Sequence, residues 1–292
     1  MIASLLIMFR ETLEAALIVG IVLGYLKKIK KTEYNKTVYL GVIIGAISSM
    51  IGAILFNIIA GGFSGVAEEV FEGITMLVGA FMLTTMILWM MKQRNIAAEL
   101  ESKVSLEIDE KHTAGLFFLV FISILREGIE TVIFLSAASF ISQENNITGA
   151  LIGIAIAIIL GYFIFLGSVN INLKKFFSVT SVLLILFAAG LIAHGIHELQ
   201  EAGVVPIILE EVWNINPPQN LDGSYPLLHD KGAIGEILKG LFGYNGNPSL
   251  IEVLSYIAFI SLIGLTWYKI AQSKAVNVKG VTGKEKVLET TH

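Results

Sequence analysis

Two copies of one charged motif lie inside long apolar stretches of this sequence. Both copies read Arg-Glu-x-x-Glu, at residues 10–14 within the apolar run 2–26 and at residues 126–130 within the run 114–141. The six charged members are Arg10, Glu11, Glu14, Arg126, Glu127 and Glu130. A charged side chain at the centre of a bilayer costs about 2.5–3.5 kcal/mol even on a lenient insertion scale. Since a helical bundle needs none of them to fold, the six side chains indicate a functional site.

The spacing of the motif predicts that its carboxylates share a face. On a helix, the two glutamates of each copy lie on the same side, and each arginine reaches the second glutamate four residues on. If the two faces meet, four carboxylates oppose two guanidinium groups, a net charge of −2. Carboxylate oxygens suit hard or borderline cations such as iron, manganese, magnesium or calcium. We therefore predict a metal site formed by Glu11, Glu14, Glu127 and Glu130, with both arginines holding the carboxylates in place.

Two other interpretations of the motifs stay open. Each arginine can neutralise its own glutamate in a purely structural pair, although this leaves Glu11 and Glu127 unexplained. The same carboxylates can also serve as a proton relay, a common role for acidic groups inside membranes.

A second polar group lies at the end of the apolar run 176–199. Its members follow one another at helical spacing and form one stripe: His194, His197, Glu198 and Glu201. Imidazole and carboxylate groups together can capture a metal. Three acidic residues that precede the third apolar run are predicted to lie on the same side of the membrane: Glu68, Glu69 and Glu72. We predict that these residues form an external access site, the alternative being an ordinary polar helix end. The order His-x-x-His-Glu differs from the His-Glu-x-x-His of zinc proteases and so argues against a hydrolase.

Composition places the chain among membrane proteins. Its 292 residues are 55% hydrophobic and 15% charged, with a mean hydropathy of +0.77. A membrane-spanning helix needs about 20 mostly apolar residues, and seven runs qualify: 2–26, 38–60, 73–91, 114–141, 147–169, 176–199 and 249–270. The sequence therefore predicts an all-α integral membrane protein with seven transmembrane helices, a transport domain over 1–270 and a cytoplasmic tail over 271–292. Because there is no cysteine, disulfides, thiolate metal sites and cysteine nucleophiles are excluded.

Charge in the connecting segments predicts the orientation. Of the 20 Lys and Arg, 18 lie outside the motifs, and 16 of these fall on one side of the membrane if the seven runs alternate. The positive-inside rule then places the N-terminus outside and the C-terminus in the cytoplasm. All five prolines fall in the external segment 200–248, which we expect to be irregular. Within it, Ala233 to Phe242 has the pattern of a short amphipathic helix that lies on the membrane or docks on a partner.

An internal repeat relates the two halves of the chain. The motifs are 116 residues apart, from 10 to 126, and the run after each motif contains a pair of glycines, Gly41 and Gly45 in one and Gly149 and Gly153 in the other. Helices 1–3 and 4–6 are therefore predicted to be related units. Because three helices is an odd number, the units have opposite orientations, as in many transporters with a charged site at the bilayer midplane.

The sequence resembles the oxidase-dependent iron transporter, or iron permease, family of bacteria and fungi. The resemblance rests on Arg-Glu-x-x-Glu in the first and fourth of seven predicted helices, on the phrase Phe-Arg-Glu-Thr-Leu-Glu-Ala-Ala-Leu-Ile-Val-Gly and on the Glu-Ala-Gly after helix 6. It implies a transporter, not an enzyme, that moves iron across the cytoplasmic membrane, with ferric iron delivered by a partner ferroxidase or iron-delivery protein outside. The motif carboxylates then bind iron as substrate, and no fixed cofactor is implied.

Alternatives to iron transport also remain. They are a proton-coupled or other divalent-metal transporter that uses the same carboxylates, and a membrane scaffold or sensor with structural charge pairs. The expected partners are iron ions and the lipid bilayer, not nucleic acid, and the sequence leaves a homo-oligomer open.

Overall fold

The computed structural model describes residues 2–92, 96–109, 113–141, 146–165, 173–220 and 222–289. Within these ranges the chain is helical and contains no strand. Its helices are α1 (Ile2–Lys28), α2 (Asn35–Ala60), α3 (Val66–Lys92), α4 (Ile96–Asp109), α5 (Thr113–Ile141), α6 (Asn146–Phe165), α7 (Leu173–Glu201), α8 (Ala233–Phe242) and α9 (Leu250–Glu289), with a short 3-10 turn, η1, at Thr32–Tyr34.

Five stretches within the described helices are long and apolar enough to cross a membrane: Thr32–Ala60, Val66–Met90, Ile147–Ile164, Val179–Glu201 and Leu250–Ile270. Helices α1 and α5 have 27 and 29 residues, a length of about 40 Å at 1.5 Å per residue. They match the others in length, but each carries the three charges of its motif near its centre. The chain is therefore an all-helical, multi-pass membrane protein.

Helix α2 shows how the outer helices meet lipid. Its large aliphatic side chains are mostly exposed, among them Ile43, Ile47, Ile51 and Ile58. An apolar face of this size is normal where the solvent is hydrocarbon. By contrast, α3 and α7 bury much of their surface, and Met76, Leu83 and Leu191 lie in the main apolar core.

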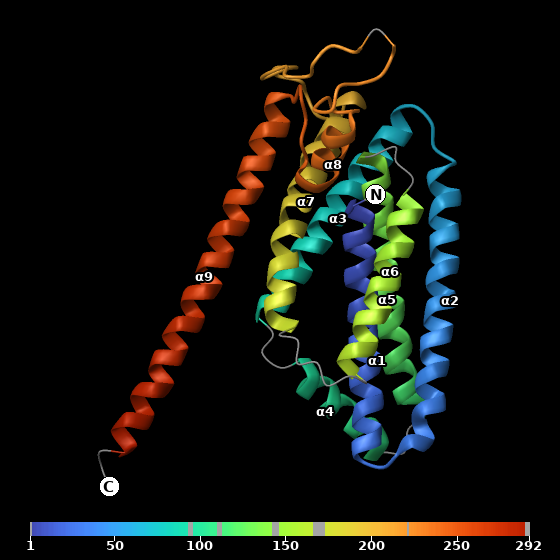
Figure 1. Cartoon of the computed structure of the whole chain (residues 1–292), viewed down its shortest axis with the longest axis vertical. Coiled ribbons are helices and arrows are strands. Elements are labelled where there is room, and N and C mark those ends of the chain that lie inside the picture. Colours follow the sequence, from blue (N-terminus) through green and yellow to red (C-terminus); the bar gives the residue numbers. More distant parts are fainter. Residues whose placement is uncertain are drawn as a thin grey trace.

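Three helix pairs make the most extensive contacts: α1 with α6, α2 with α5, and α3 with α7. Helix α1 also packs against α5, which brings the two charged motifs together. Figure 1 shows α9 at the side of this bundle, leaning away from it toward its C-terminal end. The N-terminus and α8 lie at one end of the molecule, and α4 lies at the other.

Two glycines allow corresponding helix pairs to approach closely. A Cβ atom on Gly45 of α2 would lie 3.2 Å from the carbonyl oxygen of Phe121 in α5, and one on Gly153 of α6 would lie 2.4 Å from that of Leu5 in α1. Phe121 follows Leu5 by the same 116 residues that separate the two motifs. The pairs α1–α6 and α2–α5 therefore touch at corresponding positions of the sequence.

One predicted boundary was wrong. Helix α3 begins at Val66 rather than near residue 73, so Glu68, Glu69 and Glu72 lie in its first two turns and not in a loop. Gly65 adopts a left-handed backbone with φ of 58° just before it, and its carbonyl accepts the backbone N–H of Glu68. Acidic side chains near a helix N-terminus are stabilised by the helix dipole, which explains the early start.

The segment after α3 lies between two apolar runs, and the sequence predicts no element in it. It forms the 14-residue helix α4.

Two other observations concern the C-terminal half. Helix α8 has the predicted bounds Ala233–Phe242, and α9 continues to Glu289 rather than ending near residue 270.

Candidate metal site

The packing of α1 against α5 gathers carboxylates from both motifs. One oxygen from each of Glu11, Glu14 and Glu127 can be chosen so that all three atoms lie within 4.8 Å of one another. Among the described residues, this is the only such grouping of three or more His, Cys, Asp or Glu side chains. Oxygen ligands lie about 2.0–2.6 Å from hard cations, so two ligands on opposite sides of one ion can be about 5 Å apart. The spacing therefore suits a single cation bound between the two helices.

Arg10 is buried at the centre of this group. Its side chain is 1% exposed, and its guanidinium lies 3.3 Å from Glu11 Oε1 and 2.9 Å from Glu14 Oε1. One Nη also donates to the sulfur atoms of Met86 and Met90 on α3. Thioethers are weak acceptors, so the carboxylates supply most of the stabilisation that this buried charge requires.

Arg126 holds the second motif in a more open setting. Its side chain is 53% exposed and contacts Oε1 of Glu127 and, at 3.4 Å, Oε1 of Glu130. The predicted contacts from each arginine to the glutamate four residues on are present. Glu11 and Glu127, which a structural pair with the second glutamate alone leaves unexplained, also contact the arginine of their own motif.

Several carboxylate oxygens of the two motifs nevertheless lack a hydrogen-bond partner. Oε2 of Glu11, of Glu127 and of Glu130 is buried without a hydrogen-bond partner in the structure. A buried charged oxygen without a partner is costly, and native structures rarely leave several together. Several in one place are the arrangement that a bound cation would satisfy. Glu130 lies outside the group of three but adds its charge to the same site.

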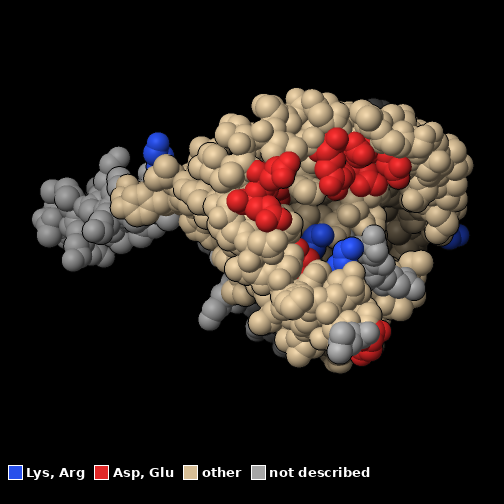
Figure 2. All heavy atoms as spheres, turned by 90° about the horizontal axis from the view of Figure 1, so that it is seen from above, with Lys and Arg blue, Asp and Glu red and all other residues tan. Residues whose placement is uncertain are grey.

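The acidic residues of α3 lie beside α7. Helices α3 and α7 cross at Gly73 and Gly195, where a Cβ on Gly73 would lie 2.8 Å from the carbonyl oxygen of Gly195. This close approach places Glu72 within electrostatic range of Glu198 and of Glu68, and Glu198 within range of Glu69. Figure 2, a view onto the α8 end of the molecule, shows Asp and Glu side chains gathered on this face.

The histidines of the predicted stripe point elsewhere. His194 is buried, and its Nδ1 lies 3.0 Å from the carbonyl oxygen of Gly190. His197 contacts Glu252 of α9 at 3.1 Å and Glu201 at 3.3 Å. Glu198 therefore lies within electrostatic range of Glu69 on α3 and of His197, whereas His194 is buried against the α7 backbone. No common set of ligands forms along the stripe.

Glu252 is not among the site residues predicted from the sequence. It is buried at the start of α9, where its carboxylate accepts the backbone N–H of Ser249 and its own N–H donates to the Ser249 hydroxyl. This reciprocal arrangement is a capping box, and the Ser-x-x-Glu pattern that predicts it stands in the sequence. By contrast, no local signal singles out Met86 and Met90, whose contact with Arg10 depends on how α1 packs against α3.

Comparison with known proteins shows the family of the chain. The profile of the Iron permease FTR1 family matches residues 1–275. The ferrous iron permease EfeU of Escherichia coli O157:H7 is 35% identical over 266 residues, which cover 89% of this chain and 92% of the relative. The ferrous iron permease EfeU of Yersinia pestis is also 35% identical, over 89% of this chain and 90% of the relative. No solved structure matches the chain.

The relatives are transporters and not enzymes, and both the motif-bearing helices and the apolar spans lie within the matched residues. A multi-pass membrane protein of this kind carries iron as its substrate. The chain belongs to the Iron permease FTR1 family.

Proposed function

We propose that iron crosses the cytoplasmic membrane through a site formed by Glu11, Glu14 and Glu127, with Glu130 as a fourth carboxylate. The observation that carries this proposal is the grouping of three carboxylate oxygens from two helices within 4.8 Å. The buried oxygens without partners support it, because a purely structural set of ion pairs would leave none. Arg10 and Arg126 keep four like charges close together when the site is empty.

The proposed membrane arrangement follows the distribution of basic residues. All seven long helices, α1 and α5 included, cross the bilayer, with the α8 end outside and the α4 end in the cytoplasm. The matching contacts of Gly45 and Gly153 support two inverted repeats. One repeat consists of α1 to α3 and the other of α5 to α7, and α4 connects them. Domain bounds of 1–270 and 271–292 remain part of this proposal.

Charge balance favours ferrous iron. With all six motif side chains ionised, the net charge of −2 is cancelled by iron(II), whereas iron(III) leaves one uncompensated positive charge. Uncompensated charge in a low-dielectric interior is unfavourable. The names of the relatives also specify ferrous iron. We therefore propose that the transported ion is iron(II). The resemblance implied ferric iron, which a partner ferroxidase would supply, and transport of iron(II) does not require that partner.

The acids around the α3–α7 crossing form the external access site. Glu68, Glu69, Glu72 and Glu198 concentrate negative charge at the end that we place outside, and such a surface raises the local concentration of cations. His194, His197 and Glu201 adjoin this surface at the end of α7. His197 contacts Glu201 and Glu252 of α9, and His194 contacts the Gly190 carbonyl of its own helix.

Uptake into proteoliposomes tests the proposal. Purified protein should transport radioactive iron with ascorbate present, which keeps it ferrous, and far less with ferric citrate. Glu11→Gln, Glu14→Gln and Glu127→Gln should each reduce ferrous uptake at least about tenfold, because one lost charged ligand changes binding by that order. Glu33→Gln, an exposed residue in η1, is the control and should transport like the wild type.

Each alternative has its own outcome. Faster ferric than ferrous uptake would restore the ferric interpretation and its ferroxidase partner. Equal uptake of manganese, zinc and iron would indicate a broad divalent-metal transporter, and proton flux without metal would indicate a relay. Folded wild-type protein without any flux would favour a scaffold or sensor.

A further inference from the structure

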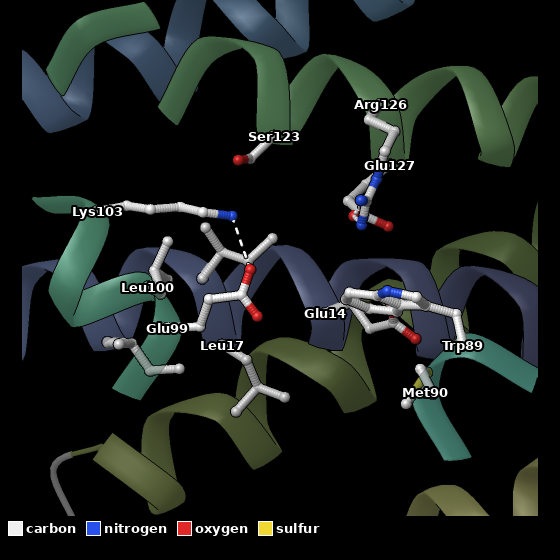
Figure 3. A pocket seen from close by; sticks show the side chains of 12 residues that line it. Glu14, Leu17, Trp89, Met90, Glu99, Leu100, Lys103, Ser123, Arg126 and Glu127 are labelled. Carbon is white, nitrogen blue, oxygen red and sulfur yellow. Dashed lines mark hydrogen bonds and ion pairs between the residues drawn. The ribbon is translucent and has the colours of Figure 1, made fainter. Parts of the chain in front are cut away.

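A cavity connects the metal site to helix α4. It has a volume of about 180 Å³ and is bordered by Glu14, Arg126 and Glu127 at the site and by Glu99 and Lys103 on α4. Figure 3 shows these side chains around one space, with Glu99 and Lys103 pointing toward each other. Oε2 of Glu127, a residue that is 3% exposed, is buried at this cavity without a hydrogen-bond partner.

The wall between the two ends of the cavity is mostly apolar. Along α1 it consists of Leu17, Ile18 and Ile21, the residues one and two turns beyond Glu14. Seven residues of helix span about 10 Å. A cation that leaves Glu14 toward α4 therefore has about 10 Å to travel with few oxygen ligands on this wall, since Ser123 of α5 is the one hydroxyl among the lining residues. A carboxylate at the far end would shorten that unfavourable passage.

Helix α4 is fixed in place by its apolar face. Leu100, Val104 and Ile108 recur every four residues and pack on the ends of α1 and α5, where Val104 is fully buried. This packing turns Glu99 and Lys103 toward the cavity, where Lys103 Nζ lies 2.9 Å from Glu99 Oε1. Glu101 lies on another face of the same helix and pairs instead with Lys28, at 3.8 Å.

We propose that Glu99 is a second cation-binding residue of the iron pathway, placed between the motif carboxylates and the cytoplasm, and that Lys103 neutralises it between transport events. An arriving cation displaces the Lys103 ammonium from Glu99, and the ammonium returns when the cation leaves. Both side chains are more than one-third exposed, and an exposed ion pair opens at little cost because water solvates the separated charges. This inference rests on the proposed function, because it takes the motif carboxylates as the preceding station.

The test separates binding from release. In proteoliposomes, Glu99→Gln should lower the maximal rate of ferrous uptake about tenfold, the change that 1.4 kcal/mol makes in a barrier. It should leave the half-saturating iron concentration unchanged within twofold. Equilibrium dialysis of the purified variant with radioactive iron(II) should show wild-type affinity at the motif site, because Glu11, Glu14 and Glu127 are intact. Lys103→Gln should raise the maximal rate, or at least not lower it, since the Lys103 ammonium no longer competes with the cation for Glu99.

Glu101→Gln is the matched control on the same helix and should behave as the wild type. Wild-type rates in Glu99→Gln, or an equal loss of rate in Glu101→Gln, would overturn the proposal. So would a loss of rate in Lys103→Gln while iron binding is retained. Failure of the proposed function looks different, because wild-type protein would then transport no iron or Glu11→Gln would transport it normally.

Discussion

Arg10 and Arg126 hold the same place in two motifs but lie in different surroundings. Arg10 is enclosed by Glu11, Glu14 and two thioethers, whereas Arg126 is half exposed at the edge of a cavity. Arginine offers a planar fork that can engage two carboxylates at once, and lysine offers one compact charge. The same substitution should therefore have unequal consequences in the two motifs.

We expect Arg10→Lys to reduce both stability and uptake. A lysine at position 10 leaves one of its two carboxylates without a partner, and breaking a buried ion pair costs about 3–5 kcal/mol. Arg126→Lys should reduce uptake but change the melting temperature far less, because water can solvate the freed groups. Thermal unfolding and ferrous uptake measured on the same two preparations check this. Equal melting temperatures in both variants would show that burial of Arg10 does not matter.

Glu198 and His197 are adjacent in sequence but should fail in different ways. Glu198 adds charge to the α3 acids, so Glu198→Gln should raise the half-saturating iron concentration and leave the maximal rate intact. His197 contacts Glu252 in the capping box of α9, so His197→Ala should lower the melting temperature, at a cost of about 1–3 kcal/mol for the polar group it leaves unpaired. Initial rates over a range of iron concentrations, with thermal unfolding alongside, separate the two. A raised half-saturation in His197→Ala at unchanged stability would instead make this histidine a metal ligand.

Among the elements, the crossing of α3 and α7 positions the acids of the proposed access site. A Cβ on Gly73 would meet the Gly195 carbonyl at 2.8 Å and the Leu199 side chain at 2.9 Å, so Gly73→Ala must push the two helices apart. We expect a destabilisation of about 1–3 kcal/mol, typical of overpacking, and a raised half-saturating iron concentration because Glu72 and Glu198 separate. Gly52→Ala on α2 is the control, since nothing lies within 4 Å of that site. Normal iron affinity in Gly73→Ala would show that the access site does not depend on this crossing.

Elements with a strong local signal were predictable from the sequence. Each long apolar run became a helix, since about 20 apolar residues admit few other structures in a bilayer. Helix α4 was missed because it is short and mixes Glu and Lys with a narrow apolar stripe, so its stability comes from packing on α1 and α5. The start of α3 was misplaced because its acidic first turn interrupts the hydropathy that marks the span.

The site was predictable up to the point where helices meet. Spacing alone places Glu11 with Glu14, and Glu127 with Glu130, on common faces. The grouping of Glu127 with the first pair, the thioethers beside Arg10 and the tie between His197 and Glu252 all depend on tertiary contacts. Local periodicity carries no information on such contacts.

At the scale of the whole molecule, the two proposed repeats differ in how open they are. Leu17 of α1 borders the cavity that reaches α4. Its counterpart 116 residues later is Ile133 of α5, which instead packs against α3. A Cβ atom on Gly79 of α3 would lie 3.7 Å from the Ile133 side chain. Inverted repeats interchange such environments when a transporter turns from one side of the membrane to the other. In the described structure the cavity lies between the motif carboxylates and α4. If the repeats exchange environments, we expect a second form in which Ile133 borders a cavity and Leu17 is packed.

Cysteine labelling tests this pairing, and the chain has no cysteine of its own to confuse the result. Leu17→Cys should react with a membrane-impermeant thiol reagent only from the α4 side, in inside-out vesicles. Ile133→Cys should react only from the α8 side, in intact cells, and more slowly, since the described form keeps it packed. Glu33→Cys and Phe63→Cys, both exposed at opposite ends, are the sidedness controls. Reaction of Leu17→Cys and Ile133→Cys from the same side would contradict the inverted repeat. Complete protection of Ile133→Cys during iron transport would show that the pathway opens without exchanging the two halves.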